Sequence, residues 1–124
     1  MELRIDSFLR KLNEKIKKEK GKDFTIGHAY FIKLKEIPED QRANEFVKIL
    51  KNSVFPLLQE YFYDEWEILI SLLGNENKRN ETCIEKLIID RFGEIKINLE
   101  NKNKIVKLLI AFTQGTEFDE ECNN

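Results

Sequence analysis

Apolar positions recur at helical intervals along most of the chain, beginning close to the N-terminus. One face of the first segment carries Ile5, Phe8, Leu9, Leu12 and Ile16. This spacing is typical of one face of an α-helix. Gly21 follows the last turn, and glycine accepts the left-handed backbone that ends many helices. The pattern therefore predicts an amphipathic helix that ends at Gly21.

Residues 22–37 mix apolar and polar positions without a regular period. We expect a turn at residues 25–27, followed by a short helix or an extended piece. Pro38 suits the first turn of the next helix, and the second half of that helix is apolar nearly all round, which predicts burial. Pro56 removes a backbone donor inside this helix, so we expect a kink near residues 52–53 or two consecutive helices.

A further helix is expected after Asp64, which suits its N-cap. This helix carries Trp66 on its inward face and ends at Gly74. The polar stretch 75–81 is typical of a linker. Another helix is predicted after the linker, ending at Gly93.

The C-terminal segment combines a period of two with a last helical pattern. Residues 94–99 alternate apolar and polar side chains, which predicts a strand, with the residues in the thirties as one candidate for its partner. A final helix closed by Gly115 and a frayed acidic tail over 116–124 are expected next. The predicted fold class is mostly α, with one minor strand: a small helical bundle over residues 1–74, and residues 75–124 as a helix–strand–helix and tail packed on the same domain.

The composition indicates a single domain of balanced charge. The chain has 124 residues, 35% of them charged, and a formal net charge of −2, so no global field favours nucleic acid or a membrane. Two cysteines occur, Cys83 and Cys122, at no metal-ligand spacing. We expect reduced thiols and a cytoplasmic protein, because neither a targeting pattern nor an apolar run of membrane-spanning length is visible.

No full catalytic constellation can be assembled from these residues. The phosphate-binding pattern G-x-x-x-x-G-K-[ST] is missing, and the single histidine, His28, excludes a pair of histidine ligands for a metal. We therefore predict no catalytic residue and no metal ligand, and an enzyme in its own right is the least favoured class. Two interpretations of His28 stay open: a partly buried side chain bonded to backbone, or a contact to a ligand at the start of a helical segment.

Charged residues gather in two places. Four lysines form a stripe beside the apolar face of the first helix: Lys11, Lys15, Lys18 and Lys22. Such a stripe is usually a solvated flank. The functional alternative is a basic edge that contacts a partner subunit or phosphates. An acidic cluster is interpreted as helix caps and solvated faces; it consists of Glu60, Asp64, Glu65 and Glu67.

Short motifs in a defined order are similar to a known family. They are LRKLNEKI at residues 9–16, IGHAYF at residues 26–31, PLLQEYFYDEW at residues 56–66 and LLG at residues 72–74. Together they resemble the C-terminal part of the McrB-type AAA+ GTPases, the motor subunits of methylcytosine-dependent restriction systems. The similarity covers roughly residues 5–74, and no clear match is found from residue 75 onward.

This resemblance implies an AAA+ lid, a small helical subdomain that packs over the nucleotide held by a larger core and contacts the next subunit of a ring. By the same resemblance, Ile26, Gly27 and His28 lie on the nucleotide side. GTP and Mg²⁺ belong to the intact family protein, and no cofactor is expected on this chain, which lacks the phosphate loop. The implied partners are the AAA+ core subdomain, neighbouring ring subunits and an McrC-like nuclease subunit, with DNA contacted only indirectly.

Two other functions fit the same residues. The first is a stand-alone helical module that binds and regulates proteins of a defence system or a phage. The second is a weak nucleic-acid binder that uses the lysine stripe, and its binding should fall steeply with salt. A lid without its core should also expose an apolar patch, which predicts self-association.

Overall fold

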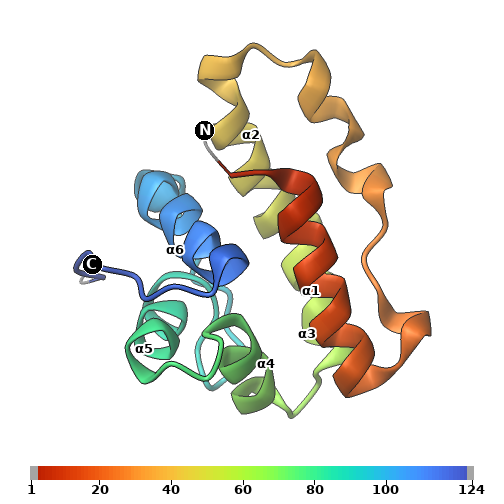
Figure 1. Cartoon of the computed structure of the whole chain (residues 1–124), viewed down its shortest axis with the longest axis vertical. Helices are drawn as coiled ribbons and strands as arrows, with labels where there is room; N and C mark the ends of the chain where they lie inside the picture. The colour runs from red at the N-terminus through yellow and green to blue at the C-terminus, as the bar shows by residue number, and fades with distance from the viewer. Residues whose placement is uncertain (1–2, 123–124) are drawn as a thin grey trace.

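Helix α1 (Ile5–Lys20) confirms the first predicted element. A computed structural model describes residues 3–122, and α1 runs along one side of the molecule (Figure 1). Its buried face carries Phe8, Leu9, Leu12 and Ile16. Gly21 ends the helix with φ at 98°, and its N–H donates to the carbonyl of Lys17 at 2.8 Å. A positive φ strains residues that have a Cβ atom, so glycine is the residue that fits here.

The segment after α1 forms short 3-10 helices. They are η1 (Lys22–Phe24) and η2 (His28–Glu36). Thr25 and Gly27, between them, have extended backbone, so the turn expected there is wrong. The short helix expected next is confirmed as η2. Its buried residues, Phe31 and Leu34, lie three apart, which matches the three-residue period of a 3-10 helix.

The long apolar helix is interrupted before Pro56, as predicted. Its three parts are α2 (Glu39–Ile49), the π turn η3 (Leu50–Val54) and α3 (Phe55–Tyr61). Pro56 lies in the first turn of α3, a position that tolerates proline. The wider turn of η3 contains Asn52 and Ser53, where the break was expected.

Helix α4 (Trp66–Leu73) follows a tight turn at residues 62–65. Glu65 occupies the N-cap position, so the cap predicted at Asp64 is wrong. Asp64 instead has φ at 59°, because the turn into α4 needs a left-handed residue, and a short polar side chain tolerates that conformation. Gly74 ends α4 as predicted.

Helix α5 (Lys78–Leu87) begins inside the stretch expected to be a linker. Asn77 caps it, because its side-chain oxygen accepts the N–H of Asn80 at 3.0 Å. A capped first turn satisfies a backbone donor, so a polar sequence can still start a helix. The linker predicted over 75–81 is therefore wrong beyond Asn77, and α5 ends well before Gly93.

The described residues contain no sheet, so the strand predicted over 94–99 is wrong. One isolated antiparallel bridge forms there, between Ile89 and Ile95. The side chain of Asp90 closes the turn between them by accepting two backbone N–H groups, at 2.9 and 3.0 Å. The partner of Ile95 is thus the segment just before it in the chain, and not the residues in the thirties. The chain enters η4 (Leu99–Asn101) before a ladder of strand hydrogen bonds can form.

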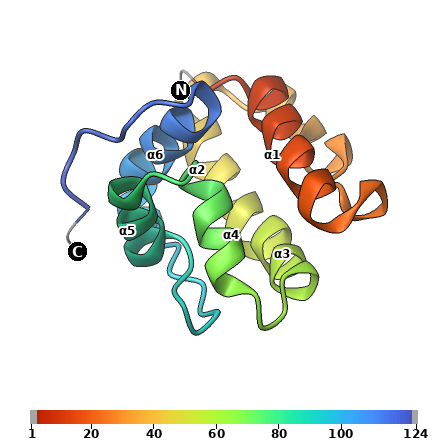
Figure 2. The same cartoon turned by 60° about the horizontal axis from the view of Figure 1, so that its bottom comes forward.

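Three aromatic rings join the helices in the core. Phe8 of α1 contacts Phe46 of α2, with ring centroids 5.7 Å apart, and Phe112 of α6 (Lys102–Gln114), at 6.0 Å. Helix α6 is closed by Gly115 in a left-handed conformation, as predicted. It packs on both α1 and α2, behind α4 and α5 in the view of Figure 2. The N-terminal and C-terminal parts therefore share one core.

The tail after α6 packs on α5 through polar and covalent contacts. The buried amide of Asn80 donates to the carbonyl of Thr116 at 3.0 Å and accepts the N–H of Phe118 at 2.8 Å. Cys122 forms a disulfide with Cys83, so the expectation of two reduced thiols is wrong. The sulfurs meet because the tail folds back along α5, which a separation of 39 residues does not reveal. The prediction of a frayed tail is also wrong for residues 116–122, which are held on α5 by these contacts. Residues 123–124 lie outside the described part of the chain.

Replacing Phe8 by alanine is expected to lower the free energy of unfolding by about 3–5 kcal/mol, because a fully buried ring is lost between three helices. Chemical denaturation followed by tryptophan fluorescence measures the change. Phe92→Ala is the matched control: Phe92 is 90% exposed, so its loss should change stability by less than about 0.5 kcal/mol. Equal losses in the two variants would contradict the packing described.

Asn80→Ala is expected to cost about 1–3 kcal/mol, because it leaves the backbone groups of Thr116 and Phe118 without their partner. Amide hydrogen exchange at Phe118 should become faster. Asn98→Ala is the control, since it removes only an exposed acceptor for the N–H of Glu100. An unchanged exchange rate at Phe118 in the Asn80 variant would show that the other contacts of the tail, the disulfide and the hydrogen bonds from Arg79, hold it without Asn80.

Candidate functional site

Asn13 of α1 holds residues 26–28 against the helix. Its side chain donates to the carbonyl of Ile26 at 2.9 Å and accepts the N–H of Ile26 at 2.6 Å. One amide thus satisfies both backbone groups of Ile26, as a neighbouring strand would. The Ile26 side chain is buried, whereas Gly27 and His28 are exposed. The double hydrogen bond therefore fixes where this exposed pair lies.

His28 is the first residue of η2 and borders a polar depression on the surface. The depression has a volume of about 560 Å³ and is lined by Asp6, Arg10, Asn13, Glu14, Lys17, Thr25 and His28. Two cationic side chains, Arg10 and Lys17, thus lie at the same edge as His28. The interpretation of His28 as partly buried is wrong, because the residue is exposed. Its role as a contact to a ligand stays a prediction.

A second depression borders His28 and combines apolar with charged side chains. Its lining includes Ile5 and Ile32 beside Arg4, Lys35, Glu39 and Arg42. Nearby on η2, Tyr30 and Ile32 are 38% and 61% exposed. Two exposed apolar side chains, Tyr30 and Ile32, therefore lie on the helix that begins at His28.

The four lysines of the predicted stripe lie in different surroundings. The Nζ of Lys11 lies over the Phe112 ring, 5.3 Å from its centroid. Burial, followed by the nearby charge of Lys15, lowers the pKa of Lys11 below its ordinary value. Lys15 and Lys18 line a groove between α1 and α4, and Lys22 is exposed on η1. Of the four, Lys11 is engaged in packing, and Lys15 and Lys18 share the groove.

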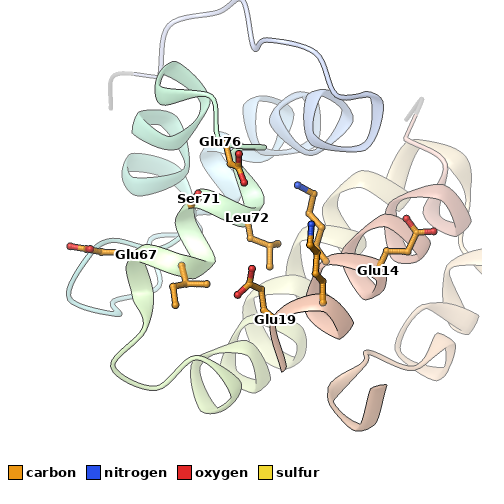
Figure 3. A pocket seen from close by; sticks show the side chains of 9 residues that line it. Glu14, Glu19, Glu67, Ser71, Leu72 and Glu76 are labelled. Atoms are coloured by element: carbon orange, nitrogen blue, oxygen red, sulfur yellow. The ribbon is translucent and has the colours of Figure 1, made fainter. Parts of the chain in front are cut away.

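The groove between α1 and α4 carries charges of both signs and has a volume of about 520 Å³. Figure 3 shows carboxylates on both of its walls: Glu14 and Glu19 on α1, Glu67 on α4, and Glu76 just after α4. These carboxylates lie in the same groove as Lys15 and Lys18. A phosphate there would meet repulsion as well as attraction, so the groove is a weak candidate for a phosphate site.

Asn13 is the residue of this edge that sequence analysis did not single out. The available signal was its position, an amide inside a helix rich in lysine and glutamate, where asparagine is a weaker helix former than its neighbours. Its partner, Ile26, lies 13 residues away in an irregular segment. No periodic pattern links the two positions, so the contact becomes visible only in three dimensions.

The described residues contain neither a metal-binding cluster nor a membrane-spanning helix. Within residues 3–122, no group of three or more His, Cys, Asp or Glu residues lies close enough together to hold a metal ion. Over the same range, no helix has both the length and the apolar character needed to cross a bilayer. The edge offers hydrogen-bond donors from Arg10, Lys17 and His28, and the same depression also contains the carboxylates of Asp6 and Glu14, so its charges suit a polar partner.

Comparison with known proteins gives a match over this same region. The family model of the McrB alpha-helical lid domain matches residues 4–69, which include Asn13 and residues 26–28. The EcoKMcrB subunit of the type IV methyl-directed restriction enzyme of Escherichia coli strain K12 is 40% identical over 63 residues. That match covers 46% of this chain and 13% of the E. coli protein, so the chain spans a small part of that relative's length. No solved structure gives a significant match.

Asn13→Ala is expected to lower the free energy of unfolding by about 1–3 kcal/mol and to speed amide exchange at Ile26, because both hydrogen bonds are lost. Hydrogen exchange followed by NMR measures both effects. Asn13→Asp keeps the acceptor for the Ile26 N–H and should retain most of its protection. Lys17→Ala, on the same helix, is the control. Equal protection of Ile26 in the alanine variants of Asn13 and Lys17 would contradict the role of Asn13.

Proposed function

Because this chain belongs to the family of McrB alpha-helical lid domains, we propose that it forms the lid over the nucleotide site of a McrB-type restriction motor. In this role, the edge at residues 26–28 faces the nucleotide. A separate core holds GTP and Mg²⁺ and carries the hydrolytic chemistry, as the resemblance to AAA+ GTPases implies. The lid alone then has no activity of its own.

The observation that carries this proposal is the double hydrogen bond between Asn13 and Ile26. It presents Gly27 and His28 from a fixed backbone, so a contact to the nucleotide needs no reordering of the loop. The space beside Gly27 is open, because a Cβ atom built there would have no neighbour within 4 Å. A ligand can therefore approach the backbone closely while His28 contributes a polar side chain.

The exposed apolar surface beside this edge supports docking onto a core. Tyr30 and Ile32 keep much of their area in solvent, and Ile32 lines the neighbouring depression. Apolar surface of this kind marks a contact with another protein surface. The AAA+ core of the motor is the partner that the family suggests for it.

Neighbouring ring subunits and an McrC-like nuclease subunit are the further partners we propose. Arg10 and Lys17, at the rim of the polar depression, are available for such contacts. DNA is contacted only indirectly in this scheme. The lysines of the stripe support this view, because Lys11 packs on Phe112 and the groove that holds Lys15 and Lys18 also contains carboxylates.

A chimeric motor tests the proposal. Residues 3–122, which include the helix α6 that covers the matched residues, replace the matching segment of the E. coli EcoKMcrB subunit, and GTP hydrolysis is measured. The chimera should hydrolyse GTP, whereas this chain alone should not. In the chimera, His28→Ala should reduce kcat/KM by about tenfold or more, the equivalent of losing one hydrogen bond to a charged ligand.

Lys48→Ala is the control for the histidine variant, since Lys48 is exposed on α2 and does not line the depressions beside His28. Equal activity of the two variants would reject the placement of His28 at the nucleotide. A chimera that folds and assembles but hydrolyses no GTP would reject the lid function itself.

A further inference from the structure

Two turns at one end of the bundle place aromatic side chains on the surface. They are residues 62–65, between α3 and α4, and residues 90–94, and both turns project at the same end in Figure 2. Tyr63 is 71% exposed and Phe92 is 90% exposed. Trp66 lies half-buried beside Tyr63, with ring centroids 6.4 Å apart. Large rings in water are unfavourable, so this surface is a candidate for a contact with another molecule.

Contacts between the two turns hold them in one arrangement. The backbone of Gly93 lies against the Trp66 ring so closely that a Cβ atom at this position would come within 2.5 Å of ring atoms. Gln59, near the end of α3, donates a hydrogen bond to the carbonyl of Gly93. Phe92 is the preceding residue, so its exposed ring extends from a backbone that is fixed on both sides.

Asp90 fixes the second turn from within. Its Oδ1 accepts the N–H of Phe92 at 2.9 Å and the N–H of Glu94 at 3.0 Å, and its carbonyl accepts the N–H of Gly93 at 3.0 Å. The ammonium group of Lys96 lies 3.3 Å from the other carboxylate oxygen. A side chain presented from a preformed turn loses little backbone entropy on binding, which favours affinity.

Carboxylates are frequent in the two turns and the adjacent helix ends. They are Glu60, Asp64, Glu65, Glu67, Glu85, Asp90 and Glu94. Three cations lie among them in ion pairs: Lys20 with Glu65, Arg91 with Glu67 and Glu85, and Lys96 with Asp90 and Glu94. Lys86 also lies in the last turn of α5. Seven carboxylates against four cations make this end acidic, although the net charge of the whole chain is only −2.

We infer that this end of the molecule binds a basic segment of another protein, one that carries arginine or lysine together with apolar side chains. The acidic aromatic surface, as we name it, consists of Glu60, Tyr63, Asp64, Trp66, Glu67 and Phe92. Its rings suit both apolar side chains and guanidinium groups, through cation–π contacts, and its carboxylates suit the same cations. Aromatic residues and arginine also carry much of the binding energy at protein interfaces.

The charge of the surface argues against two other classes of partner. Nucleic acids bind proteins chiefly through phosphates, which these carboxylates repel. Anionic membrane surfaces attract basic segments and are disfavoured for the same reason. A basic protein segment is the partner that fits the rings and the charges together.

This inference is independent of the proposed lid function. Tyr63 and Trp66 lie within the matched residues 4–69, whereas Phe92 lies beyond them. The surface therefore requires both parts of the chain, and GTP hydrolysis by the chimera described above neither tests nor depends on it.

Fluorescence gives a direct test, because Trp66 is the single tryptophan of the chain and lies in the surface itself. The probe is a synthetic peptide in which Arg and Leu alternate, and the matched peptide has Glu in place of Arg. The Arg peptide should cause a saturable change in Trp66 emission. Phe92→Ala should weaken its affinity by about tenfold or more, as expected of an interface hot spot, whereas Phe92→Tyr should retain it.

Charge variants test the acidic component. The double variant Glu60→Gln, Asp64→Asn should weaken binding of the Arg peptide and make its affinity less dependent on salt. Glu100→Gln, an exposed position on η4, should leave both properties unchanged.

The inference is overturned if the Arg peptide gives no saturable change, if the Glu peptide binds equally well, or if Phe92→Ala has no effect on a variant that remains folded. Single-stranded DNA and anionic vesicles are tested in parallel. Binding of either that depends on Phe92 would also overturn the assignment of a basic protein partner, as would self-association of the chain that depends on Phe92 in sedimentation experiments.

Discussion

The contact of Phe8 with Phe46 and Phe112 is the constraint on which the rest of the structure depends. It joins the first helix, the long interrupted helix and the last helix around one point. The residues matched by the lid family, 4–69, therefore do not close their own core. Their apolar faces are covered by α6, which belongs to the part of the chain without a family match. Packing density in protein cores leaves little room for such a cover to shift.

This shared core supports two kinds of surface. At one edge, a single amide on α1 holds an irregular loop, so that Gly27 and His28 are exposed from a rigid base. Near the turn into α4, the backbone of Gly93 lies against the Trp66 ring. This contact joins the two turns that carry exposed aromatic side chains. In both cases a regular helix provides the rigid element, and the exposed residues lie on short loops, which is the usual division of roles between scaffold and binding residues.

Patterns with a strong period predicted the structure well, and contacts between distant residues were beyond their reach. The apolar face of α1, the break near Pro56 and the glycine stops at Gly21, Gly74 and Gly115 all follow from local rules. The motifs also indicated the family that the comparison shows. Two failures come from local bonds of a single side chain: Asn77 caps a helix in a polar stretch, and Asp90 closes a turn just before the alternating residues. The third comes from a distant contact, because Cys122 reaches Cys83 only where the tail reverses direction.

The disulfide has a mechanical consequence. It closes a covalent ring from Cys83 to Cys122 that contains the Asp90 turn and the whole of α6. Tension applied beyond Cys122 passes through the sulfur atoms into α5 instead of peeling α6 away from the core. Under load, the helix that covers the lid residues is therefore shielded, and resistance depends on how firmly α5 is anchored to α4 and α6.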